Sequence, residues 1–98
     1  MIVRDGNLLR VTSPMTMETV GVLLDAGTAL FGSGETEFDL AAVPDVDSAA
    51  LALMLEWTRL AGARKVQLIF SNLPHDLTSL ATLYGALELI PQRATASH

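Results

Sequence analysis

The chain contains no cysteine and only two histidines, His75 and His98. The absence of cysteine excludes disulfides, thiolate catalysis and Cys-based zinc sites, and it fits a reducing compartment such as the cytosol. Two histidines this far apart do not provide the ligand spacing of a catalytic metal site. We therefore expect no metal ion and no other cofactor.

Charged residues are also scarce, at 17% of the chain with a net charge of −5. An acidic chain repels phosphate backbones, so nucleic acid is not an expected partner. The longest mainly apolar stretch, 49–55, is far shorter than the about 20 residues of a membrane-spanning helix. The first eleven residues, MIVRDGNLLRV, are broken up by charges and lack the apolar block of a signal peptide. We expect a cytoplasmic protein.

Hydrophobic residues, in contrast, make up 50% of the 98 residues. A single domain of this length buries roughly 60–65% of the surface that its unfolded chain exposes, which leaves little room for a deep substrate cleft. Surplus apolar surface usually meets another protein. The composition therefore favours a binding protein over an enzyme, and its partner would be a second protein or another copy of the chain in a homodimer.

Hydrophobic periodicity and turn residues predict strands and helices that alternate after an initial hairpin. Asp5-Gly6-Asn7 supplies the hairpin turn, and Gly85 the left-handed end of the last helix. The order ββαβαβα indicates an α/β fold with a mixed sheet and packed helices, in one domain over 1–91 with a polar, frayed tail at 92–98. The expected strands are 1–3, 8–11, 37–43 and 65–70, and the expected helices are 17–31, 48–61 and a third that opens at 71–74.

The stretch PDVDSAALALMLEW, 44–57, places Asp45, Asp47 and Ser48 at the start of the second helix. A carboxylate or hydroxyl there accepts hydrogen bonds from unpaired backbone N–H groups, so Asp47 or Ser48 is expected to cap the helix. An alternative is an acid and base pair of a hydrolase. That alternative requires a cleft with an apolar pocket around one carboxylate, and the sequence offers none.

The second helix has apolar residues on two sides, one stripe containing Leu51 and the other Leu53 and Trp57. A helix that lies on a sheet needs only one such stripe. Either neighbouring helices cover the second stripe, or part of it, with Trp57, contacts another protein, since tryptophan is enriched in binding hot spots.

The hairpin, the order of elements and the helix start DSAAL at 47–51 together resemble the STAS domain, the fold of bacterial anti-sigma-factor antagonists and sulfate-transporter tails. The resemblance covers about residues 1–91. Within this family, VDSAALALMLEWTRLAG, VQL and DLTSLATLY look most like the MlaB group. That group comprises small cytoplasmic subunits of ABC complexes that transport phospholipids and maintain outer-membrane lipid asymmetry.

This resemblance implies two roles, which differ at a single position. Alignment on Asp47 and Leu51 puts Ala49 where the anti-sigma-factor antagonists carry the phosphorylated hydroxyl, and alanine cannot accept phosphate. In the MlaB-like pattern the hydroxyl directly follows the aspartate, here as Ser48, and contacts the ATPase subunit. Ala49-Ala50 departs from both patterns, in which glycines are common.

The resemblance therefore implies a non-enzymatic subunit that binds an ABC transporter ATPase and is held at the inner membrane through that partner. The residues expected to bind it are Ser48, Asp47, Leu51 and Trp57. The alternative is an anti-sigma-factor antagonist regulated by a Ser/Thr kinase, with Ser48 as the phosphoacceptor.

Overall fold

A computed structural model of the chain describes residues 1–93 and confirms the element order ββαβαβα, followed by a single 3-10 turn. The strands form one mixed sheet in the order β1-β2-β3-β4, with β1 antiparallel to β2 and the other two pairs parallel. The elements are β1 (Ile2–Asp5), β2 (Leu8–Val11), α1 (Val20–Ala29), β3 (Glu35–Asp39), α2 (Ser48–Ala63), β4 (Gln67–Ser71), α3 (His75–Leu83) and η1 (Leu87–Leu89).

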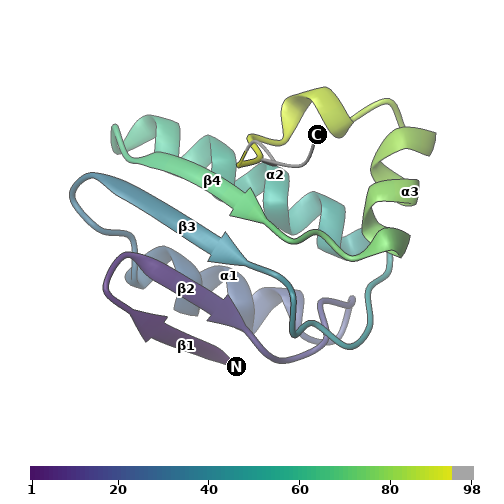
Figure 1. Cartoon of the computed structure of the whole chain (residues 1–98), viewed down its shortest axis with the longest axis horizontal. Coiled ribbons are helices and arrows are strands. Elements are labelled where there is room, and N and C mark those ends of the chain that lie inside the picture. The colour runs from purple at the N-terminus through teal and green to yellow at the C-terminus, as the bar shows by residue number, and fades with distance from the viewer. Residues whose placement is uncertain (94–98) are drawn as a thin grey trace, which may run out of the picture.

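Helices α1 and α2 lie side by side on one face of the sheet, and α3 lies beyond its β4 side (Figure 1). None of the helices in the described part of the chain has the length and apolar character that spanning a bilayer requires. Because side chains alternate along a strand, each strand sends every second residue beneath the helices. The buried residues of β2, β3 and β4 are Leu9, Val11, Thr36, Phe38, Leu68 and Phe70.

The turns expected at two glycines are confirmed. Gly6 has a φ of +64° in the hairpin turn, and Gly85 has a φ of +67° just after α3. Side chains rarely adopt this left-handed backbone conformation, so glycine is the residue that these turns favour.

Several predicted element boundaries differ from the structure, and two of the larger differences arise because side chains end or delay the element. The third strand was expected over 37–43, but it ends at Asp39, whose carboxylate accepts a hydrogen bond from the Ala41 N–H and turns the chain. The first helix was expected from Met17 but begins at Val20. The Thr19 hydroxyl bonds the Pro14 carbonyl and the Thr16 N–H, which holds a turn ahead of the helix.

The end of the described chain was also predicted incorrectly. Gln92 and Arg93 were assigned to a frayed tail, whereas the Arg93 N–H donates to the Phe70 carbonyl and Gln92 pairs with β4. Backbone groups at a sheet edge gain partners in this way. The remaining residues of the predicted tail, 94–98, lie outside the described part.

Arg93 also joins a group of charged side chains on the sheet face opposite α1 and α2. Its Nη2 atom lies 2.7 Å from Glu37 Oε1 and 3.0 Å from Glu35 Oε2. Burial raises the pKa of Glu37, but the Ser71 hydroxyl beside it and the Arg93 guanidinium favour the carboxylate, so its pKa lies below the ordinary value. The Ser71 contact does not reach full hydrogen-bond geometry, so we attribute the effect mainly to Arg93.

This lowered pKa predicts a loss of stability in acid. The unfolded chain takes up the Glu37 proton first as pH falls, so the stabilisation is complete above the unfolded-state pKa and is lost as pH falls through the lower folded-state pKa. The urea concentration at the unfolding midpoint should therefore decrease when the pH is lowered from 7 to 3. In Glu37→Gln this midpoint should decrease less. Glu88→Gln, at an exposed glutamate of η1, serves as the control and should follow the wild type. An unaltered pH dependence in Glu37→Gln would refute this assignment.

Candidate partner-binding site

The loops that follow β2 and β3 meet at the carboxyl ends of these strands, because the two strands are parallel and end on the same side of the sheet. Backbone hydrogen bonds join the two loops. The Met15 N–H donates to the Asp45 carbonyl at 2.9 Å, and the Asp47 N–H donates to the Met15 carbonyl at 3.3 Å. These bonds hold the starts of α1 and α2 next to each other.

Asp47 connects the two loops, and its side chain caps α2 as predicted. Its Oδ1 accepts from the Ala49 N–H at 2.8 Å, and its Oδ2 accepts from the Met17 N–H at 3.1 Å. One carboxylate thus caps α2 and fastens the loop that leads into α1. Both oxygens thus hold backbone N–H groups of the loop and helix start on either side of Ser48.

Asp47→Ala is expected to lower the free energy of unfolding by about 1–2 kcal/mol, through loss of the cap and of the second bond to the loop. Chemical unfolding followed by far-ultraviolet circular dichroism measures this change. Asp45→Ala is the matched control, because the Asp45 side chain is exposed, and it should change stability by less than about 0.5 kcal/mol. Equal effects of the two substitutions would contradict the capping role.

Ser48 is the first residue of α2, and its side chain is exposed at the joined loops. Asp47 caps this end of the helix, since its Oδ1 accepts from the Ala49 N–H and its carbonyl accepts from the Ala50 N–H. A hydroxyl here is accessible to another protein or to a modifying enzyme. The structure therefore exposes Ser48, and its part in either role implied by the family resemblance stays a prediction.

A shallow apolar groove of about 220 Å³ lies between α1 and α2 and begins at Ala49, the residue after Ser48. Gly21 and Ala52 are exposed at its surface, and their small size leaves the hollow open. An ion pair between Glu56 and Arg59, 2.6 Å apart, lies at its far end. We call this surface the α1–α2 groove, and its lining residues are Val20, Gly21, Leu24, Ala49, Ala52, Leu53 and Glu56.

The groove was not predicted as a site from the sequence. Its signal is a set of small residues, Gly21, Ala49 and Ala52, on helices whose neighbouring positions are large and apolar. The spacing of Ala49 and Ala52 puts both on one face of α2. Gly21, however, is 28 positions earlier, and only the helix packing brings it to the same place. A groove of this size accommodates a large apolar side chain of a partner.

Two of the four predicted contact residues are not on the surface. Leu51 is 6% exposed and Trp57 is 0% exposed, so the expectation that Trp57 is presented to a partner is corrected. The Trp57 ring stacks on Phe38, with centroids 4.0 Å apart, and its Nε1–H donates to the Leu24 carbonyl. The flanking helix thus covers the second apolar stripe of α2, which was the alternative left open by the sequence.

The hydrolase alternative finds no support in this geometry. Neither Asp45 nor Asp47 lines any of the three cavities described for residues 1–93. Asp45 is exposed and Asp47 is occupied by two backbone N–H groups. An acid and base pair needs both carboxylates to face a substrate in one cleft. This edge of the sheet is instead suited to contact with another macromolecule.

Comparison with known proteins identifies one family and several similar structures. The model of the family described as "Mlab, STAS domain" matches residues 2–91. No curated protein matches the sequence. A candidate anti-sigma factor antagonist from Thermotoga maritima superposes with a TM-score of 0.76 at 10% identity, covering 98% of this chain and 86% of that one.

Two further solved structures share the fold. A STAS domain protein from Planctomyces limnophilus, described as an anti-sigma-factor antagonist, has a TM-score of 0.72 at 10% identity, covering 97% of this chain and 89% of that one. The anti-sigma factor antagonist SpoIIAA in its unphosphorylated form has a TM-score of 0.68 at 12% identity, covering 99% and 88%. At such low identity these likenesses establish the architecture.

Proposed function

Since the chain belongs to the Mlab-type STAS domain family, we propose that it is a non-enzymatic subunit that binds the ATPase of an ABC phospholipid transporter. Domains of this family act through contacts with other proteins. In this proposal the chain supports assembly or activity of the transporter, and so contributes to lipid asymmetry of the outer membrane. It resides in the cytoplasm and reaches the inner membrane only through its partner.

The observation that carries the proposal is an exposed hydroxyl at a capped helix start, near an apolar groove. Ser48 provides a polar contact, and the α1–α2 groove provides a place for an apolar side chain of the ATPase. Binding hot spots have this character, with an anchor in a pocket and polar contacts around it. Asp47 supports the surface from beneath by fixing both helix starts.

Trp57 has an indirect part in this proposal, whereas Leu51 is buried and does not line the groove. The Trp57 indole holds α1 in position through the Leu24 carbonyl. Leu24 itself lines the groove. The shape of the groove therefore depends on a buried contact that the partner does not reach.

The exposed Ser48 also favours a second candidate, an anti-sigma factor antagonist controlled by a Ser/Thr kinase. A phosphate would add about −1.5 to −2 charges at a helix N-terminus, where negative charge is favourable. Against this, Ala49 occupies the position where the antagonist pattern carries its phosphorylated hydroxyl. Incubation with the cognate kinase and measurement of the intact mass tests this candidate, because phosphorylation at Ser48 would support it.

Isolation of the tagged protein from its native cells, followed by mass spectrometry, separates the two candidates. The proposal predicts the ATPase and the membrane subunits of an ABC transporter among the co-purified proteins. Recovery of a soluble kinase and no transporter subunit would reject it in favour of the second candidate.

A further inference from the structure

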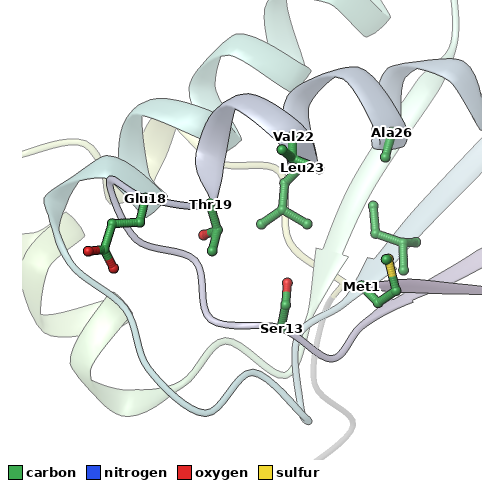
Figure 2. A pocket seen from close by; sticks show the side chains of 8 residues that line it. Met1, Ser13, Glu18, Thr19, Val22, Leu23 and Ala26 are labelled. Atoms are coloured by element: carbon green, nitrogen blue, oxygen red, sulfur yellow. The ribbon is translucent and has the colours of Figure 1, made fainter.

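A second cavity, of about 230 Å³, lies between α1 and the beginning of β1, on the other side of α1 from the groove (Figure 2). Its walls come from the chain start, from the first strand and from one face of α1. The apolar lining residues are Met1, Ile2, Val22, Leu23 and Ala26, and the polar ones are Ser13, Glu18 and Thr19.

Ser13 is the polar lining residue whose hydroxyl faces this mainly apolar cavity. Figure 2 shows its side chain on the loop after β2, with the hydroxyl directed across the cavity toward α1. The Ser13 Oγ atom is buried and has no hydrogen-bond partner within residues 1–93. A buried hydroxyl without a partner is unfavourable, and native proteins normally satisfy such groups.

The other polar groups at the cavity are already engaged or point elsewhere. The Thr19 hydroxyl donates to the Pro14 carbonyl at 2.7 Å and accepts from the Thr16 N–H at 2.9 Å. The Glu18 carboxylate points away from the cavity in Figure 2. Ser13 is thus the group available to a bound molecule.

We propose that this cavity, which we call the Ser13 pocket, binds a small neutral molecule with an apolar body and one hydroxyl group that pairs with Ser13. The Ser13 hydroxyl donates and accepts hydrogen bonds, so it matches a hydroxyl in either direction. A charged group would be unfavourable here, because the Ser13 hydroxyl is neutral and the Glu18 carboxylate points away from the cavity. This site is independent of the proposed transporter partner.

The size of the Ser13 pocket limits the ligand. An apolar cavity of about 150 Å³ holds a benzene molecule, so this cavity holds about nine non-hydrogen atoms. Met1 and Val22, which line the pocket, are 73% and 69% exposed, so the pocket reaches the surface of the protein. Simple phenols and short-chain alcohols have the required size and chemistry.

The test is a titration of the full chain with 4-methylphenol, followed by ¹H–¹⁵N NMR. We expect saturable shifts at Ser13, Leu23 and Ala26, with a dissociation constant near about 1 mM for so small a ligand. In Ser13→Ala the affinity for 4-methylphenol should fall about tenfold, which is the effect of one buried hydrogen bond. The affinity for toluene, which lacks the hydroxyl, should change by less than about twofold.

A second variant, Ala26→Leu, fills the cavity from α1 and should abolish the binding of both probes. Circular dichroism establishes whether each variant is folded. If Ala26→Leu does not fold, the Ser13→Ala titration alone tests the proposal. Absence of saturable shifts in the wild type up to about 10 mM, shifts located away from the pocket, or equal affinities in Ser13→Ala would overturn the proposal.

Discussion

Trp57→Ala is expected to lower the free energy of unfolding by about 3–5 kcal/mol, the usual range for deleting a large buried aromatic side chain. The Trp57 ring is fully buried, stacks on Phe38 at 4.0 Å and lies 6.4 Å from Phe70. It also packs on Gly27 of α1 so closely that a methyl group there would come within 2.5 Å of the ring. Its removal leaves a cavity at the point where α1, α2 and the sheet meet.

Urea unfolding followed by far-ultraviolet circular dichroism measures this loss, since the substitution removes the only tryptophan and its fluorescence. Domains of this kind have about 5–15 kcal/mol of stability in total, so the variant should be marginally folded. Tyr84→Ala is the matched control, because Tyr84 is an aromatic residue that is 61% exposed, and it should change stability by less than about 0.5 kcal/mol. A loss below about 1 kcal/mol in Trp57→Ala would show that this ring is not central to the core.

Ser48→Arg is expected to weaken binding of the ATPase subunit by about thirtyfold or more, equivalent to about 2 kcal/mol. The side chain is exposed, so a large substituent does not disturb the core. The arginine would obstruct the mouth of the α1–α2 groove and would place a positive charge at the start of a helix. The charge should lower the stability of the fold by no more than about 1 kcal/mol.

A binding titration with the purified ATPase subunit measures this effect. Ser33→Arg is the matched control, since Ser33 is an exposed serine before β3, at the opposite end of the sheet from Ser48. It should change the affinity by less than about twofold. Equal affinities of Ser48→Arg and the wild type would remove Ser48 from the binding surface.

Features that depend on neighbouring residues could be predicted from the sequence. The hairpin turn at Gly6, the left-handed end of α3 at Gly85 and the cap at Asp47 each follow from short-range backbone chemistry. The order of elements followed from periodicity. The family resemblance, confirmed over residues 2–91, supplied the fold as a whole.

Features that depend on residues far apart in the sequence could not be predicted from it. The burial of Trp57 requires a space opposite Gly27, and its indole bonds a carbonyl 33 positions earlier. The periodicity of α2 showed two apolar stripes without indicating that α1 covers the second. The α1–α2 groove and the Ser13 pocket likewise arise between segments that only the fold brings together.

The same reasoning applies to the apparent tail. Gln92 and Arg93 looked like a polar end, but this segment pairs with the open edge of β4, where the Phe70 N–H donates to the Pro91 carbonyl and the Arg93 N–H donates to the Phe70 carbonyl. Arg93 then reaches Glu35 and Glu37 on β3, across β4. Such an ion pair spans more than 50 positions of sequence, and no local pattern predicts it.

Site-specific photo-crosslinking in native cells tests the docking surface most directly. A photoreactive amino acid at Ala52, exposed in the α1–α2 groove, should form an adduct with the ATPase subunit of an ABC transporter, and the same group at Ser33 should form none. An ATPase adduct from Ser33 alone, or adducts from Ala52 with unrelated proteins only, would contradict docking at this groove.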